Sequence, residues 1–148
     1  MKSCLAVVWL CGFLLVPLCL AQPPDEAVVL YNKGVQYLDA GKPFDALEAF
    51  TEALARKPGF ADAYCGKGDA YSRTSRFPLA IEAYSQAIKL QPGHAGALSG
   101  RGFAYYHSEQ FEPAREDLAA AIKADSSKAD LVIGFLFDAL EMFRSSLK

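Results

Sequence analysis

The chain has 148 residues, of which 52% are hydrophobic and 22% are charged, so it is long enough for one domain with a sizeable core and too apolar for a disordered tail. The formal net charge is −2, and acidic and basic residues are interspersed without a run of either sign. This pattern excludes the electrostatic footprint of a protein that binds nucleic acid or an anionic membrane surface.

Residues 1–21 have the layout of a signal peptide. Lys2 is their only charged residue, an apolar run covers residues 4–20, and Ala21 is a small residue of the kind that signal peptidase requires. We therefore expect export, to a periplasm or into a secretory pathway, with a polar linker over residues 22–26. The alternative is an uncleaved anchor, because the run is at the lower limit of what spans a bilayer. The chain would then be a membrane-anchored assembly factor that touches the membrane only through this segment.

Three of the four cysteines, Cys4, Cys11 and Cys19, lie within this segment. A cleaved chain keeps only Cys65, so no intrachain disulfide can form. We expect the exported domain to be held together by its hydrophobic core.

Three consecutive units of 34 residues, 27–60, 61–94 and 95–128, share many columns of residues. Within each unit, apolar and small residues recur at helical spacing in two blocks, with a break between them, which predicts a helix, a short turn and a second helix. The columns are Leu30/Tyr64/Leu98, Gly34/Gly68/Gly102, Tyr37/Tyr71/Tyr105, Ala46/Ala80/Ala114, Phe50/Tyr84/Leu118, Ala53/Ala87/Ala121 and Pro58/Pro92.

These columns resemble the tetratricopeptide repeat. The resemblance implies an all-α fold, namely a right-handed α-solenoid of three helix-turn-helix repeats with a seventh, capping helix and tail over residues 129–148. The chain departs from the family pattern in two ways. The usual Leu before the Gly is replaced by Lys33, Lys67 or Arg101, and the third unit lacks its closing Pro.

Two columns need a structural explanation. Glycine inside a helix costs about 1 kcal/mol relative to alanine, so we expect the Gly34/Gly68/Gly102 column to allow close contact with alanines of the antiparallel partner helix. A basic column, Lys33/Lys67/Arg101, stands beside an acidic column, Glu48/Glu82/Glu116. We expect the aliphatic part of each basic side chain to pack on the core and its charged group to reach solvent, where it can pair with a glutamate of the acidic column.

Residues 129–144 are unusually apolar for a capping helix. One stripe can cover the open end of the third unit, whereas Ile133, Phe137 and Leu140 form a second stripe that a single neighbour cannot bury. This second stripe is the basis of an alternative function, a structural module that self-associates into a homo-oligomer through its C-terminal helix.

No catalytic constellation is evident. His94, His107 and Cys65 have no metal-ligand spacing, and no glycine-rich phosphate loop follows a strand. We therefore expect a non-enzymatic protein without cofactor or metal.

In tetratricopeptide arrays the first helices line a concave groove, and helical spacing from the glycine and tyrosine columns predicts which residues face it here. They are Val28, Tyr31, Val35 and Leu38, then Asp62, Cys65, Asp69 and Arg73, then Ser99, Phe103, Tyr106 and His107, with Ile133, Phe137 and Leu140 as an extension. Such a groove suits an extended segment or a helix with apolar side chains. For each residue taken singly, packing against its neighbours is an equally good interpretation.

We predict a protein-protein interaction adaptor of an exported compartment that binds a protein or peptide in this groove. Tyr31, Phe103 and Tyr106 are the predicted anchors, and Asp69 and Arg73 the predicted orienting charges. Family members that bind chaperones hold a C-terminal carboxylate with a clamp of Lys, Asn and Arg. The matching positions here are Tyr31, Val35, Gly66, Gly96 and Gly100, so we expect no carboxylate clamp.

Overall fold

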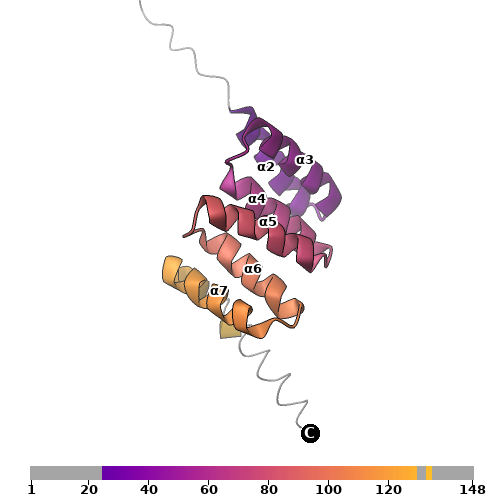
Figure 1. The fold of residues 1–148 in the computed structure, drawn as a ribbon. Coiled ribbons are helices and arrows are strands. Elements are labelled where there is room, and N and C mark those ends of the chain that lie inside the picture. The colour runs from indigo at the N-terminus through magenta and orange to yellow at the C-terminus, as the bar shows by residue number, and fades with distance from the viewer. Residues whose placement is uncertain (1–24, 130–132, 135–148) are drawn as a thin grey trace, which may run out of the picture.

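The computed structural model describes residues 25–129, 133 and 134. Their helices form three pairs, one for each predicted unit, and these residues contain no strand (Figure 1). The pairs are α2 (Glu26–Asp39) with α3 (Pro43–Arg56), α4 (Ala61–Arg73) with α5 (Phe77–Leu90), and α6 (Ala95–His107) with α7 (Phe111–Ala124), followed by the 3-10 helix η1 (Ser126–Lys128). The predicted all-α class and the helix-turn-helix units are confirmed.

Several predictions fall outside the described residues. These are the signal peptide over 1–21, the first part of the linker, most of the capping segment 129–148, and Phe137 and Leu140 within it. The sequence predicted seven helices, whereas six α-helices lie in the described part. The linker is also shorter than predicted, because α2 begins at Glu26, where the Asp25 side chain accepts a hydrogen bond from the Ala27 N–H at 3.1 Å.

The turn within each unit has the same backbone shape. Gly41, Ser75 and Glu109 occupy equivalent positions 34 residues apart, and all three have positive φ, at 70°, 56° and 60°. Glycine adopts this left-handed conformation without steric cost, whereas the serine and the glutamate do so under strain. The second helix therefore folds back on the first in the same way in each unit.

The pairs stack into a short solenoid, in which the first helices form one layer. α2 packs on α4 and α4 on α6, while α3 lies against α4 and α5 against α6. The second helices do not pack on one another to the same extent. We call α2, α4 and α6 the inner helices and α3, α5 and α7 the outer helices; the inner layer is the one on which the predicted groove residues lie.

One aromatic side chain from α3 and one from α5 each reach between two inner helices. A β-carbon added at Gly34 or at Gly66 would lie 2.6 Å from the Phe50 ring, and one added at Gly68 or Gly100 would lie 2.5 Å from the Tyr84 ring. Each ring is therefore held between a glycine of its own unit and a glycine of the next unit.

The third unit repeats half of this arrangement, since a β-carbon at Gly102 would lie 2.8 Å from Leu118. The expected packing of the glycine column on alanines is thus wrong in its main contact. The large side chain of the outer helix is nearest to the space left by each glycine, and at Gly102 the Ala114 carbonyl oxygen also lies 3.2 Å from a β-carbon.

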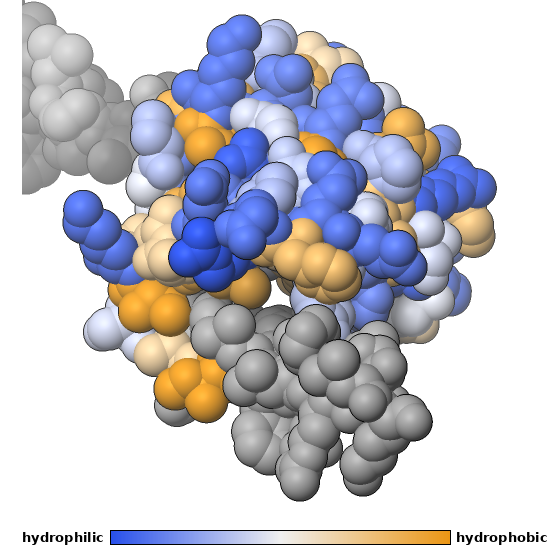
Figure 2. All heavy atoms as spheres, turned by 60° about the horizontal axis from the view of Figure 1, so that its bottom comes forward, coloured by the Kyte–Doolittle hydropathy of each residue, from blue (hydrophilic) through white to orange (hydrophobic). Residues whose placement is uncertain are grey.

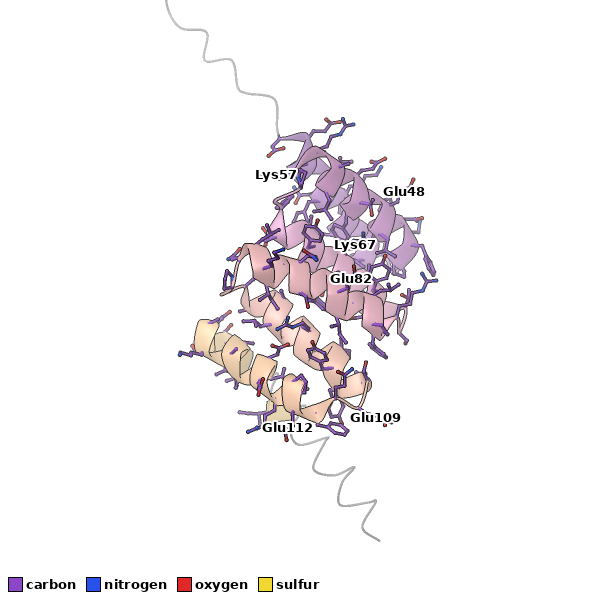
Figure 3. The ribbon with its side chains drawn as sticks, in the orientation of Figure 1. Glu48, Lys57, Lys67, Glu82, Glu109 and Glu112 are labelled. Carbon is purple, nitrogen blue, oxygen red and sulfur yellow. The ribbon has the colours of Figure 1, made fainter. Side chains whose placement is uncertain are left out.

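The basic column also differs from expectation in the third unit. Arg101 does not pair with Glu116 but donates to both carboxylate oxygens of Asp117, at 2.6 and 2.8 Å, and to the Ser85 hydroxyl at 3.1 Å. This ion pair is largely buried and joins α6 to both neighbouring outer helices. Figure 3 labels the members of the basic and acidic columns in the second unit, Lys67 on α4 and Glu82 on α5.

The packing of rings against glycines predicts that Gly66→Ala lowers the free energy of unfolding by about 1–3 kcal/mol, because a methyl group there would overlap the Phe50 ring. Gly59→Ala is the matched control, since nothing lies within 4 Å of a β-carbon at Gly59, and it should change stability by less than about 0.5 kcal/mol. Urea unfolding followed by circular dichroism measures both. Equal stability of the two variants would contradict this role of Gly66.

Candidate functional site

The end of the inner layer nearest the N-terminus is apolar and aromatic. The Tyr31 ring lies 5.8 Å from the Phe50 ring and 5.2 Å from the Phe60 ring, centroid to centroid, and both contacts are tilted. Val35 is half-buried against the same cluster, and Val28 is 38% exposed. The structure thus brings Tyr31 and Val35 together as predicted, and adds Phe60, which precedes α4 and which no sequence column singled out.

The opposite end carries a larger aromatic cluster. The His107 ring stacks on Phe77 with centroids 5.0 Å apart and lies 4.3 Å from Phe103. Tyr106 contacts His107 at 5.5 Å and Phe111 at 5.8 Å. Three predicted groove residues are therefore neighbours at the end of α6.

Phe77 and Phe111 were not predicted to join this cluster. Each is the first residue of an outer helix, at the position that Pro43 occupies in the first unit. The aromatic replacement of that proline in two units was the signal in the sequence that could have identified them.

The polar residues in the middle already have partners within the molecule. The Tyr84 hydroxyl donates to Asp69 Oδ1 at 2.7 Å and lies 3.3 Å from the Ser72 hydroxyl. Arg73 Nη1 donates to the Leu38 carbonyl oxygen at 2.8 Å, near the C-terminal end of α2, where orphan carbonyls and the helix dipole favour a cation. These hydrogen bonds hold Asp69 and Arg73 in place, so the two side chains would orient a partner, as predicted, without moving.

His94 joins the starts of two inner helices, a role that the sequence analysis did not predict. Its Nδ1 accepts the Ala97 N–H at 3.0 Å and so caps the N-terminus of α6. Its Nε2 lies 3.0 Å from Asp62 Oδ1. Because Nδ1 acts as an acceptor, the ring proton must be on Nε2, which donates to Asp62. This bond ties the start of α6 to the start of α4.

Two tyrosines report the negative charge of this region. Burial raises the pKa of Tyr84 far above its ordinary range, and the adjacent Asp69 raises it further. Burial also raises the pKa of Tyr31, with smaller contributions from Asp62, Cys65 and Asp69. Two carboxylates of α4 therefore act on the same phenol of α2.

Three of the predicted groove residues are largely closed to a partner. Leu38, Cys65 and Ser99 are buried, with exposed fractions of 5%, 9% and 8%, and the Ser99 hydroxyl donates to the Gly96 carbonyl oxygen at 3.1 Å. Contact with a partner at these positions would be limited to small areas. The half-buried residues Tyr31, Val35, Phe103 and Tyr106 present more surface.

The remaining features of the described part suggest no chemistry. A pocket of about 150 Å³ between α2 and α3 is lined by Lys33, Tyr37, Asp45, Glu48, Ala49 and Glu52. No three His, Cys, Asp or Glu side chains among the described residues are grouped as metal ligands would be. None of the described helices is both long enough and apolar enough to span a bilayer.

Two of the five positions of the carboxylate clamp are closed by the fold. Gly66 and Gly100, where the clamp requires Asn and Arg, are each in contact with an aromatic ring, of Phe50 and Tyr84 respectively. A longer side chain at either position would collide with that ring. The clamp is therefore excluded by packing as well as by residue type.

The fold and this inner layer define a helical repeat protein of the solenoid class. Two family models described as tetratricopeptide repeat match residues 31–93 and 68–133, and together they span 31–133. The chain belongs to the tetratricopeptide repeat family.

Several solved structures are similar to the chain over most of its length. The first TPR domain of human RPAP3 is 25% identical, with a TM-score of 0.74, and the match covers 84% of this chain and 99% of that one. The first TPR of Spaghetti (RPAP3) bound to the HSP90 peptide SRMEEVD is 24% identical, with a TM-score of 0.72 and coverages of 80% and 96%. MamA is 27% identical, with a TM-score of 0.62 and coverages of 72% and 58%. No curated protein matches the sequence.

The buried Tyr84 predicts a loss of stability at alkaline pH. Its pKa is raised in the folded state, so above about pH 10 the unfolded chain binds fewer protons at this group than the folded chain does. Below that pH, Tyr84 makes its full contribution to the free energy of unfolding. Above that pH, the free energy of unfolding falls by up to about 1.4 kcal/mol per pH unit. Urea unfolding between about pH 9 and about pH 11 should show a shallower decline for Tyr84→Phe than for the wild type. Equal slopes would contradict the assignment.

Proposed function

We propose that the protein is a non-enzymatic interaction adaptor, which binds a peptide or a helix of another protein along the inner helices. One observation carries the proposal: half-buried aromatic and aliphatic side chains lie on the first and third inner helices, Tyr31 and Val35 on α2 and Phe103 and Tyr106 on α6. Apolar side chains that are partly exposed on a rigid helical layer provide contact area at low entropic cost.

The relatives support the same class of function. The structure of Spaghetti (RPAP3) contains an HSP90 peptide, and the second TPR domain of human RPAP3 was solved in complex with the HSP70 peptide SGPTIEEVD. Both share the fold of this chain, at 24% and 22% identity. Peptide binding by domains of this fold favours a peptide or protein as the ligand here, whereas the sequence and polarity of that ligand are a separate question.

We also propose that residues 1–21 direct export, so that the adaptor acts in a periplasm or a secretory pathway. The support is the apolar run with a single basic residue before it and Ala21 at its end. Intact mass of the mature chain tests this: a chain that begins at Gln22 supports export with cleavage, whereas a chain that retains the apolar run supports the membrane-anchored alternative.

A second candidate function is self-association through a C-terminal capping helix. Ile133, one of the three residues predicted for it, is 60% exposed, and Phe137 and Leu140 lie outside the described residues. Figure 2 shows apolar residues among the mainly hydrophilic surface at this end of the molecule. Light scattering decides: a dimer that Ile133→Asp converts to a monomer would support this function, and a strict monomer at high concentration would rule it out.

Peptide binding on the inner helices predicts that the double variant Phe103→Ala, Tyr106→Ala binds peptide at least about tenfold more weakly than the wild type. The reason is that buried aromatic anchors dominate interface energies. The probe is the tightest peptide selected by the purified protein from a random 16-residue library displayed on phage, and its Kd is measured by fluorescence anisotropy. The matched control is Phe44→Ala with Leu90→Ala, which removes two exposed apolar side chains, 60% and 46% exposed, from outer helices.

The control should keep the wild-type Kd, and both double variants should keep the helical circular dichroism signal. Unchanged affinity in the Phe103 and Tyr106 variant, or an equal loss in the control, would remove the inner layer as the binding site.

A further inference from the structure

The turn after the third unit begins with the same backbone shape as the two turns between units. Lys57, Gln91 and Asp125 follow the three outer helices with φ of −137°, −140° and −148°, and each donates its N–H to the carbonyl oxygen four residues earlier. The first two of these turns lead into the inner helices α4 and α6. A turn of the same shape after α7 therefore directs the chain to the place of a fourth inner helix, beside α6.

The described residues beyond this turn fit such a helix. Ala129 stands 34 positions after the first residue of α6 and has helical φ and ψ of −58° and −44°. Ile133 and Gly134 are helical as well. Gly134 is the next member of the column that contains Gly66 and Gly100, the glycines on which the preceding outer helix places its ring. The segment from Ala129 thus continues the repeat in register.

The third unit does not make the contact that fixes the earlier inner helices. In the first two units the ring of the outer helix reaches the glycine of the next inner helix through Cζ, at 2.6 and 2.5 Å from an added β-carbon. Leu118 is the equivalent residue of α7, and it meets Gly102 of its own unit through Cγ at 2.8 Å. A leucine has no atom as far out as Cζ, and among the described residues nothing lies within 4 Å of a β-carbon at Gly134.

A fourth inner helix in this register would lengthen the groove at its aromatic end. Successive inner helices lie side by side, α2 on α4 and α4 on α6, so residues of one column become neighbours. Phe137 and Leu140, outside the described residues, are the next members of the columns that contain Phe103 and Tyr106. Ile133, on the same stripe, is 60% exposed. The stripe would therefore add apolar surface next to the predicted anchors.

Resting on the proposed function, we propose that the segment from Ala129 docks beside α6 as a fourth inner helix that binds the same peptide as Phe103 and Tyr106, and that Leu118 limits this docking. The ligand is a segment whose apolar side chains continue past α6. Because Leu118 does not span the distance to Gly134, part of the binding free energy is spent on docking, and the apparent affinity is reduced by the fraction of molecules in which the helix is not docked.

The test supplies the missing ring in the full chain. The hydroxyl of Tyr84 is bonded to Asp69 and Ser72, whose positions are taken by Phe103 and Tyr106 in the third unit, so phenylalanine is the ring that suits position 118. Leu118→Phe should slow amide hydrogen exchange in the segment from Ala129 at least about fivefold. It should also lower the Kd of the peptide selected from the random 16-residue phage library about three- to tenfold.

Ala119→Phe is the matched control, because it adds the same ring to α7 at an exposed position. It should change the exchange rates and the Kd by less than about twofold. Thermal unfolding of every variant verifies the fold.

Gly134→Ala shows whether the new ring acts through Gly134. Alone, its methyl group meets no described neighbour, and alanine favours a helix, so exchange should not become faster than in the wild type. Combined with Leu118→Phe, the methyl group would overlap the ring, as it would at Gly66, and should cancel the gain in protection and in affinity. Phe137→Ala leaves position 118 unchanged and tests the binding role by itself, and it should raise the Kd about three- to tenfold.

Unchanged exchange in Leu118→Phe, or a gain that Gly134→Ala does not cancel, would overturn the docking in this register. A Kd that neither Leu118→Phe nor Phe137→Ala changes would overturn the role of the segment in binding. Protection that rises with protein concentration would identify a second copy as the occupant of this face and would also overturn the proposal. Failure to select any peptide would instead count against the proposed function, and the exchange rates would still decide the docking.

Discussion

The fold depends on one contact that is made twice, an aromatic ring held between two glycines. Phe50 lies between Gly34 and Gly66, and Tyr84 between Gly68 and Gly100. Because a β-carbon at any of these glycines would overlap a ring, the contact sets how closely successive inner helices approach the outer helix between them. The shape of the inner layer, and of any groove on it, follows from this packing.

The same contact constrains function. Two of the positions at which a carboxylate clamp would place polar side chains are the glycines that accommodate the rings, so packing and clamp compete for the same space. A scaffold interaction thereby disfavours one class of ligand.

The sequence predicted the repeat, the helix pairs and the family, because residues that recur every 34 positions report the same local environment in each unit. It also predicted that Phe103, Tyr106 and His107 share a surface, since helical spacing fixes their direction. It could not predict that Phe50, Tyr84 and Leu118 rather than alanines fill the space at the glycine column, or that Arg101 binds Asp117 instead of Glu116. Those contacts depend on the rotation of one helix against another, as does the contact of His94 with Asp62, whose partners lie in different units.

The central claim is that the inner helices form the binding surface, and the most direct measurement is backbone amide chemical-shift mapping by NMR as a selected peptide is added. The account predicts that shift changes concentrate on α2, α4 and α6, near Tyr31, Asp62, Asp69 and Phe103. Changes confined to the outward faces of α3, α5 and α7 would contradict it.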